Sequence, residues 1–299
     1  MSTQLPQKNR ELQNHHMDST RWNGFEHRQG DIVIATWAKS GTTWMQQIVA
    51  KLLFGSSADV PIMSVCPWLE RRGVPINKIF AKLDRQEHRR FLKTHLPVDS
   101  LVFSENASYI YVARDGRDAL WSWYNHHSRY TDAVYRLFNE TPGRVGPPLE
   151  KPGADIVEYF HTWLDRDGYP VWPFFSHIHS WWQIRRLPNV LLVHFNDLKR
   201  DLEGNMRRIA KFLQIDVPEQ EWDAVIRHCS FEYMKQNSEI LMPELVGSME
   251  GGAESFIYKG TNGRWRDTLT SSDIRKYERI ANQNLPTDCA QWLANGGSF

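Results

Sequence analysis

The segment Asp31-Ile-Val-Ile-Ala-Thr-Trp-Ala-Lys-Ser-Gly-Thr-Thr-Trp44 decides the fold class of this chain. Residues 31–37 form a short apolar run rich in β-branched side chains, which is typical of a strand buried on both faces. Apolar residues at helical spacing begin at Thr42, and Gly41 lies at the bend between the two patterns. The segment therefore predicts a strand, a tight loop and a helix in direct succession.

Three further short apolar runs predict additional strands, and two of them lead into helical patterns. The runs cover residues 90–94, 109–114 and 190–195, and the helical patterns cover residues 117–127 and a segment that ends near Leu213. Strands that alternate with helices indicate a parallel sheet with helices on both faces. Because no internal repeat or linker divides the sequence, we expect residues 1–299 to form a single α/β domain.

Composition and charge narrow the class of protein. The chain has 299 residues, of which 41% are hydrophobic, and is therefore long enough for a sizeable core. A formal net charge of +1 gives no electrostatic reason to expect nucleic acid or a membrane surface as a partner. Cys66, Cys229 and Cys289 are scattered and match neither a disulfide framework nor zinc-ligand spacing. We expect no metal site and a reducing compartment.

The ends and loops of the chain carry weaker signals. Residues 1–24 are polar and lack the apolar core of a signal peptide, so a loosely ordered lead-in is expected. No apolar run reaches the roughly 20 residues that cross a bilayer, which favours a cytoplasmic protein. Residues 130–153 and 238–263 are rich in glycine or proline and predict two long surface loops, the first serving as a lid or substrate wall.

Basic residues stand at the ends of three predicted strands. Lys39 follows the first strand, Lys93 and His95 end the second, and Arg114 ends the third. Ligands of parallel sheets bind beyond the carboxyl ends of the strands, so these groups should converge at one edge. The loop from Lys39 to Thr43 would add backbone N–H groups and hydroxyls at a helix N-terminus, which together suit an anion. The alternative is an ordinary strand-to-helix turn.

The other polar motifs also have two interpretations each. His95 could act as a general base, because an unperturbed histidine has a pKa of roughly 6.5, or it could be a surface or hydrogen-bonded residue. Arg114 suits a phosphate through its planar fork, or it could pair with a neighbouring aspartate. Ser122 could meet Arg114 only if the intervening turn folds back. Lys259 and Gly260 offer a cation amid flexible backbone, which is a weak signal alone.

The ordered set of motifs resembles the cytosolic sulfotransferases that use 3′-phosphoadenosine-5′-phosphosulfate (PAPS). The matching segments are residues 35–44, 93–97, 112–118 with Ser122, 174–212, 230–237 and 259–265. The resemblance runs from about residue 30 to residue 265, and the ordered set is more specific than any one segment. It implies a metal-free enzyme on a sheet related to that of P-loop nucleotide kinases. The implied reaction moves a sulfuryl group from PAPS to a hydroxyl of a small molecule and leaves 3′,5′-adenosine bisphosphate.

The resemblance also implies a role for each matching residue. His95 would take the proton of the hydroxyl as it attacks sulfur in line, Lys39 would stabilise the bridging oxygen, and Lys93 would hold the sulfuryl group. Donor contacts are implied for the rest of the set: Ser40, Gly41, Thr42 and Thr43 at the 5′-phosphate, Arg114, Ser122, Lys259 and Gly260 at the 3′-phosphate, and Trp44, Phe231 and nearby Cys229 at adenine.

This sequence departs from the family pattern at several positions. Phe195 stands where the family often has tyrosine, and Tyr258 replaces an arginine before the lysine–glycine pair, so both would contact the donor less favourably. We expect weaker donor binding and no change of reaction. Arg266, residues 270–271 and Arg275 replace the lysine, threonine–valine and glutamate of the family's dimer motif. A monomer, or a dimer that does not use that motif, is expected.

The acceptor and the rival functions are less well defined. Trp68 lies where the family has an aromatic wall of the acceptor pocket, although a plain core role is equally open, and the 13 tryptophans favour a phenol or another flat acceptor. A kinase would need lysine after glycine in the first loop, an order that is missing here. A catalytically silent nucleotide-binding protein would have lost Lys39, Lys93 or His95. A carbohydrate sulfotransferase of the same family would usually carry a membrane anchor.

Overall fold

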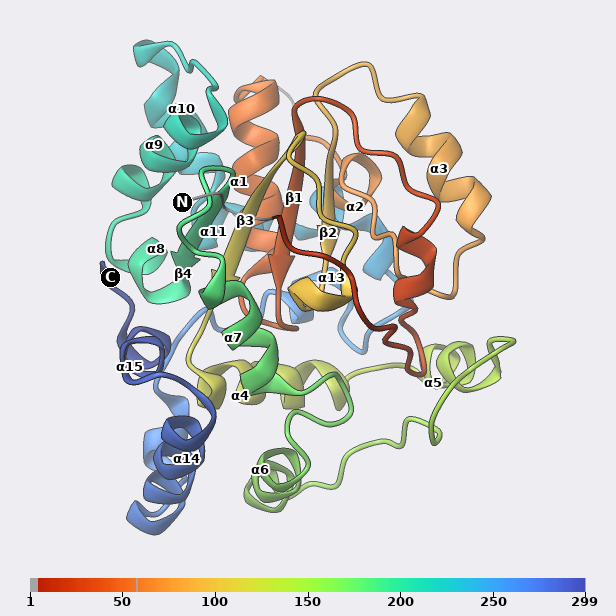
Figure 1. Ribbon diagram of the computed structural model, residues 1–299, viewed down its shortest axis with the longest axis vertical. Coiled ribbons are helices and arrows are strands. Elements are labelled where there is room, and N and C mark those ends of the chain that lie inside the picture. Colours follow the sequence, from red (N-terminus) through yellow and green to blue (C-terminus); the bar gives the residue numbers. More distant parts are fainter. Residues whose placement is uncertain (1–4, 58, 299) are drawn as a thin grey trace.

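The computed structural model describes residues 5–57 and 59–298 and has a four-stranded parallel sheet at its centre (Figure 1). The strands are β1 (Asp31–Thr36), β2 (Phe91–Thr94), β3 (Ala107–Ala113) and β4 (Val190–His194), and their order is β2-β1-β3-β4. Every neighbouring pair is parallel. The predicted α/β class, with one parallel sheet flanked by helices, is confirmed.

Helices surround this sheet and make up most of the regular structure. In chain order they are α1 (Thr42–Phe54), α2 (Ile62–Val65), α3 (Ile76–Asp84), α4 (Gly116–His127), α5 (Asp132–Glu140), α6 (Ile156–Asp165), α7 (Phe174–Gln183), α8 (Phe195–Arg200), α9 (Leu202–Leu213), α10 (Trp222–His228), α11 (Phe231–Gln236), α12 (Ser238–Leu241), α13 (Gly252–Phe256), α14 (Ser271–Asn284) and α15 (Thr287–Asn295). Short 3₁₀ helices cover Ser19–Trp22, Val98–Ser100, Glu219–Glu221, Pro243–Leu245 and Arg264–Asp267. In Figure 1, α9 and α10 lie on the β4 side of the sheet and α3 on the β2 side.

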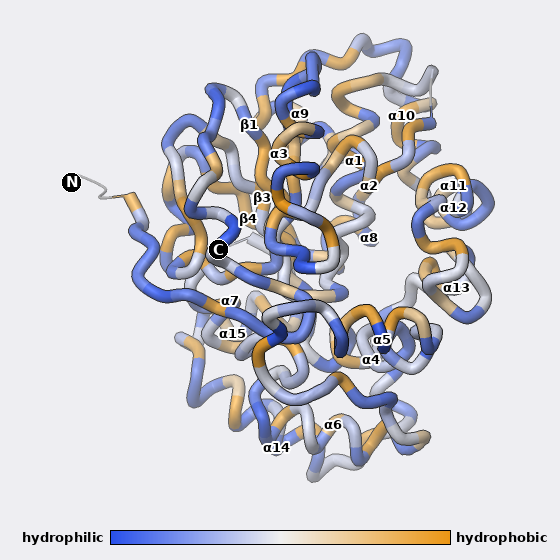
Figure 2. Tube along the Cα trace, turned by 90° about the vertical axis from the view of Figure 1, so that its right-hand side faces the viewer, coloured by the Kyte–Doolittle hydropathy of each residue, from blue (hydrophilic) through white to orange (hydrophobic). Residues whose placement is uncertain are grey.

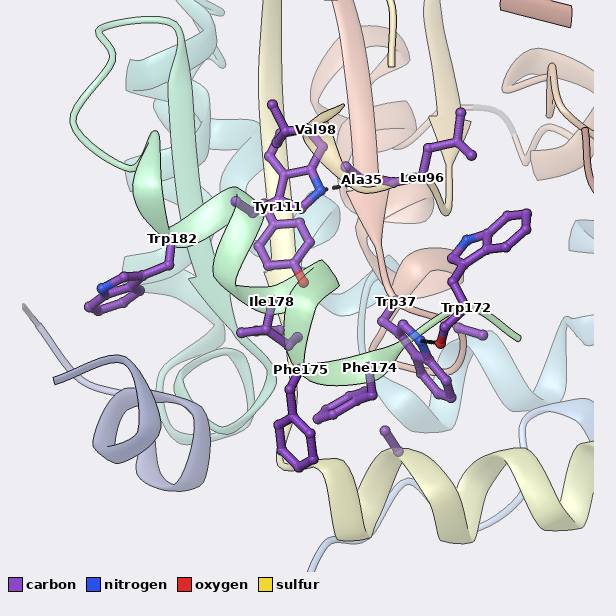
Figure 3. Close-up of a cluster of buried hydrophobic side chains, with 14 of the residues drawn as sticks. Ala35, Trp37, Leu96, Val98, Tyr111, Trp172, Phe174, Phe175, Ile178 and Trp182 are labelled. Carbon is purple, nitrogen blue, oxygen red and sulfur yellow. Dashed lines mark hydrogen bonds between the residues drawn. The ribbon is translucent and has the colours of Figure 1, made fainter. Parts of the chain in front are cut away.

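Alternating side chains of β1 are buried in two separate hydrophobic cores, one on each face of the sheet. This is why the strand is apolar throughout. Ile32 and Ile34 point into a core shared with α1, α9 and α10. Val33 and Ala35 join the larger core on the other face, which is rich in aromatic side chains. Figure 3 shows part of that larger core, where the indole N–H of Trp37 donates to the carbonyl oxygen of Trp172. A strand covered on both faces loses the polar–apolar alternation of a surface strand.

Residues 5–24 are more ordered than the sequence suggested. The segment contains the 3₁₀ helix Ser19–Trp22, and the side chains of Met17 and Trp22 are buried in the large core. The Trp22 indole N–H donates to Glu70 Oε2 at 3.0 Å. The expectation of a loosely ordered lead-in is therefore wrong for this part, because a few apolar anchors hold an otherwise polar segment. Residues 1–4 lie outside the described residues.

The two predicted long loops also contain regular structure. The first holds the nine-residue helix α5, whose Val134 is buried with Tyr130 and Leu149 in a small satellite cluster. The second contains α12 and α13, which pack together with α11 at one side of the molecule, as Figure 2 shows. Glycine-rich composition hid these short helices, since tertiary contacts rather than helical propensity stabilise them.

Two further features bear on the sequence expectations. All three cysteines are buried and free, in line with the absence of a disulfide framework. The predicted helix after β4 is interrupted at Asp201, where the side chain accepts a hydrogen bond from the Gly204 backbone N–H and starts α9. None of the helices in the described part of the chain has the length and apolar character of a bilayer-spanning segment.

Candidate active site

The loop between β1 and α1 forms the floor of the site. Gly41 has a φ of +113° and precedes the first turn of α1, where no side chain caps the helix. A Cβ atom at Gly41 would lie 2.9 Å from Phe195 Cδ2. The position therefore requires glycine, both because of its positive φ and because a side chain would clash with Phe195. The side chain of Ser40 is buried, and its Oγ has no partner among the described residues. Free helix amides and an unpaired hydroxyl create a place for an anion.

Lys39 extends from this loop into the site. Its Nζ lies 3.8 Å from the centroid of the Phe256 ring. Burial, together with the charges of Arg114 and Lys93, lowers the pKa of Lys39 to about 7. A lysine with a depressed pKa beside two other cations would be stabilised in its charged form by a bound anion.

The end of β2 brings a second lysine and the histidine beside this loop. Trp68 forms a parallel bridge with Lys93, and the Lys93 Nζ lies 4.4 Å from the centroid of the Trp68 ring. Burial lowers the pKa of Lys93 to about 8. The ring of Trp68 also meets the ring of His95 edge-on, with 5.1 Å between their centroids. Trp68 therefore lines the site rather than serving only as core.

His95 is held on three sides by hydrogen bonds. Its Nδ1 lies 2.9 Å from the carbonyl oxygen of Thr36 and 3.1 Å from the hydroxyl oxygen of the same residue. Since a carbonyl can only accept, we assign the proton to Nδ1. The backbone N–H donates to Glu70 Oε1 at 2.6 Å, and the carbonyl oxygen accepts from His177 Nε2 at 3.0 Å. Nε2 of His95 is left as the unprotonated nitrogen. Burial and the charge of Lys93 lower the pKa of His95 to about 3.

Arg114 lies where β3 ends, and it does not pair with a neighbouring aspartate. Its Nε donates to Asn262 Oδ1 at 2.9 Å, and its Nη2 donates to the Thr261 carbonyl oxygen at 3.1 Å. Asp115 instead caps α4 and pairs with Arg117 at 2.6 Å. Burial lowers the pKa of Arg114 to about 10. The loop that contains Thr261 and Asn262, which we call the C-terminal loop, thus contacts the end of β3 although the two segments are far apart in the sequence.

That C-terminal loop also places glycine against an aromatic ring. Gly260 has a φ of +61°, and a Cβ atom there would lie 2.5 Å from Phe231 Cδ2. The carbonyl oxygen of Gly260 accepts a hydrogen bond from Lys199 Nζ at 2.6 Å. Trp44 packs edge-on against Phe195, with 5.3 Å between ring centroids, and its indole N–H donates to the carbonyl oxygen of Cys229 at 2.7 Å.

One cavity of about 890 Å³ unites these groups. The sequence-predicted residues that line it are Lys39, Gly41, Thr42, Thr43, Trp44, Trp68, Lys93, His95, Arg114, Ser122, Phe195, Phe231, Tyr258, Lys259 and Gly260. Ser122 therefore reaches the same cavity as Arg114. Ser40 and Cys229 do not line the cavity; both are buried behind it, and burial raises the pKa of the Cys229 thiol.

Several lining residues were missed in the sequence. They are His16, Arg71, His126, Lys199 and Arg264, each of which contributes a polar side chain to the cavity. Arg264 is the residue after Gly263, and its guanidinium carbon lies 5.4 Å from the centroid of the Tyr258 ring. Arg264 lies within the matching segment 259–265 but was not singled out there, and the other four positions belong to no local motif.

The carboxyl ends of the parallel strands thus gather cations and a buried histidine, which is the arrangement of an enzyme site for an anionic substrate. A family model described as the sulfotransferase domain matches residues 29–288, and the chain belongs to this family. A glycolipid sulfotransferase of Mycobacterium tuberculosis is 31% identical over 300 residues, which cover 93% of this chain and 92% of that protein. Sulfotransferase 1B1 of Mus musculus is 31% identical over 271 residues, covering 87% and 84%.

Solved structures give the same fold. A mouse sulfotransferase, SULT7A1, was crystallised with PAP, which is 3′,5′-adenosine bisphosphate. It superposes with a TM-score of 0.71 at 23% identity, and the match covers 92% of either chain. A retinol dehydratase in complex with androsterone and the inactive cofactor PAP also has a TM-score of 0.71 at 23% identity, covering 90% of this chain and 84% of that one. At this identity the likeness supports the fold, and the expected sulfotransferase fold is confirmed.

Proposed function

We propose that this sulfotransferase moves the sulfuryl group of PAPS to a hydroxyl of a small molecule, with His95 as general base. The observation that carries the proposal is the tautomer of His95. Because Nδ1–H is committed to the Thr36 carbonyl oxygen, Nε2 is the atom free to take a proton inside the cavity.

The residues around the first loop fit a phosphosulfate donor. The uncapped start of α1 supplies backbone donors, and Lys39, Lys93 and Arg114 supply positive charge. Burial lowers the pKa values of all three cations. A bound anion would compensate for the lost hydration and stabilise their charged forms. The PAP-bound relatives of this fold agree with such a donor.

We assign the remaining donor contacts from the resemblance to the family. Trp44 and Phe231 line the cavity and would hold adenine. Arg114, Ser122, Lys259 and Gly260 would hold the 3′-phosphate. Thr42 and Thr43, with Gly41, would hold the 5′-phosphate, and Phe195 and Tyr258 would make apolar contacts in place of polar ones. Cys229 contributes through its carbonyl oxygen, which fixes the Trp44 ring.

The chemical step divides between three side chains. His95 Nε2 accepts the hydroxyl proton as the hydroxyl oxygen forms its bond to sulfur. Lys39 stabilises the charge that develops on the bridging oxygen as the old sulfur–oxygen bond breaks, and Lys93 holds the sulfuryl oxygens. The negative charge of the donor would raise the pKa of His95 from its low value, which makes the imidazole a better base in the complex. Positioning and charge stabilisation do most of the work in such transfers.

The other part of the cavity suits a small acceptor with an apolar body. Trp68, Trp123, Tyr130 and Phe138 line it, so a phenol or a flat alcohol fits. Androsterone and retinol, bound to structural neighbours, are alcohols of this kind. We place the reaction in the cytoplasm, where buried free thiols persist. We also expect a monomer, or a dimer that does not use the family motif.

The test is transfer of labelled sulfate from PAPS to a panel of phenols and alcohols, with ATP as the control donor. His95→Ala should abolish labelling and keep PAP affinity within about threefold. His179→Ala is the matched control, because His179 lies on α7 outside the cavity. Binding of ATP in preference to PAP would overturn the proposal in favour of a kinase. Labelling that survives in His95→Ala would overturn the role of His95.

A further inference from the structure

Arg71 is a cation in the cavity with no partner of its own. Its side chain is half-buried and lines the cavity. The backbone of Arg71 is fixed, because it forms an antiparallel bridge with Met17 and its carbonyl oxygen accepts a hydrogen bond from Arg21. The guanidinium, however, has neither a hydrogen bond nor an ion pair with any residue that the structure describes. Burial lowers the pKa of Arg71, as expected for an uncompensated charge.

The charged and polar neighbours of Arg71 differ from those of Arg114 at the donor end of the cavity. The groups whose charge acts on Arg71 are Tyr130 and Glu244. Those acting on Arg114, at the donor end, are a different set: Asp118, Arg264 and Asp115. Trp68 pairs with Lys93 at the end of β2, and Arg71 lies three residues further along, beside Met17. The charge of Arg71 also lowers the pKa of Lys93, so Arg71 is close enough to the end of β2 to act on that lysine.

A buried histidine beside Arg71 is also unsatisfied. His16 lines the cavity, is 5% exposed, and its Nδ1 has no partner among the described residues. Its ring stacks on Phe138 with 4.6 Å between centroids and meets Trp68 edge-on at 5.6 Å. Buried polar atoms are nearly always hydrogen-bonded, so an unpaired one on the lining of a cavity is available to a polar group of a bound ligand.

We propose that the acceptor carries an anionic group, such as a carboxylate or a sulfate ester, which is distinct from the hydroxyl that is sulfated and pairs with Arg71. This inference rests on the proposed function and specifies its substrate class. A planar guanidinium binds such a group through two parallel hydrogen bonds, and a hydroxyl or ether near that group would satisfy His16. Glu244 is the opposing charge: it lies exposed on the lining of the cavity and accepts a hydrogen bond from Ser64 Oγ at 3.2 Å.

The experiment compares two phenols of equal length, one ending in a carboxylate and the other in the corresponding methylamide. The unmodified enzyme should favour the carboxylate by about 10- to 100-fold in kcat/KM, since a hydrogen-bonded charge pair contributes that much. Arg71→Gln should lose most of this preference, and Arg71→Lys should keep part of it. Arg136→Gln, which removes an exposed arginine of α5 outside the cavity, should keep all of it.

Binding of each phenol to the enzyme–PAP complex, measured by calorimetry, keeps this inference separate from the transfer reaction. A carboxylate preference in binding that Arg71→Gln removes supports the inference even if no label is transferred. Equal affinity for both phenols in the unmodified enzyme would overturn it while leaving sulfuryl transfer to neutral phenols intact. If Arg71→Gln weakens PAP binding tenfold or more and treats both phenols alike, Arg71 serves the donor and the inference is wrong.

Discussion

Glu70 Oε1 accepts a hydrogen bond from the backbone N–H of His95 at 2.6 Å, while Oε2 of the same carboxyl accepts one from the Trp22 indole at 3.0 Å. The hydroxyl of Thr94 also donates to Oε1 at 3.1 Å. Glu70 is fully buried, and burial raises its pKa against the effect of these donors. One side chain therefore joins the N-terminal segment to the strand end that carries the base.

We predict that Glu70→Gln destabilises the fold and slows catalysis. A glutamine amide offers one acceptor oxygen where the carboxylate offers two, so at least one buried donor loses its partner, at a cost of about 2–3 kcal/mol. Glu105→Gln, at an exposed position, should stay within about 0.5 kcal/mol. Urea unfolding and steady-state kinetics measure the two effects. Destabilisation without any fall in kcat would show that Glu70 does not position His95.

The low pKa of Lys39 predicts that PAP affinity depends on pH. In the free enzyme Lys39 titrates at about 7, and the charge of a bound 5′-phosphate would raise that value. Below pH 7 the lysine is already charged and affinity is maximal. Above pH 7 binding must take up a proton, so affinity should fall by up to about tenfold per pH unit until the raised pKa is passed.

Calorimetry between pH 7 and 8.5 in two buffers of different ionisation enthalpy measures this proton uptake directly. Lys39→Arg is the matched variant, because arginine stays charged across the range. Its PAP affinity should depend less on pH between 7 and 8 than that of the unmodified enzyme, because Lys93, with a pKa of about 8, is then the lysine of the site that still titrates. A flat profile for the unmodified enzyme would mean that Lys39 does not contact the phosphate.

Gly41 is predicted to tolerate no side chain. Gly41→Ala combines a positive φ with a Cβ contact of 2.9 Å to Phe195, so we expect a loss of about 2–4 kcal/mol and much weaker PAP binding. Gly247→Ala provides the comparison, since Gly247 also has a positive φ, of +78°, but nothing lies within 4 Å of its Cβ position. That variant should lose only about 1–2 kcal/mol. Equal losses in urea unfolding would argue against the steric contact.

Arg264 is predicted to replace the cation that the family has before its lysine–glycine pair. Its Nε is buried without a partner among the described residues, and its charge acts on Arg114. Arg264→Gln should therefore weaken PAP binding about 5- to 20-fold. Arg266→Gln is the control, because Arg266 is exposed and lies outside the cavity. If the two variants bind PAP equally well, Tyr258 leaves the donor site one cation short, as the sequence alone suggested.

The local sequence was sufficient for the sheet and the first loop. A buried parallel strand needs an apolar run, and a helix that begins beside an anion needs a loop without a bulky residue at its bend, so β1 and Gly41 could both be read directly. Burial that comes from distant segments could not be read in this way. The lead-in was expected to be loose because its polar composition conceals Met17 and Trp22, whose partners lie elsewhere in the chain.

The sequence by itself determined the α/β class, the parallel sheet and the family to which the chain belongs, because these depend on local periodicity and on motifs a few residues long. The tertiary structure alone decided which side chains share one cavity. Arg71 and His16 lie in no motif, Arg264 lies inside the 259–265 segment without being singled out by it, and each reaches the cavity only after segments that are distant in sequence pack together. Polar atoms of these side chains have no hydrogen-bond partner among the described residues, and this is the reason to assign them to a ligand. Whether a partner is present depends on the tertiary structure and not on the local sequence.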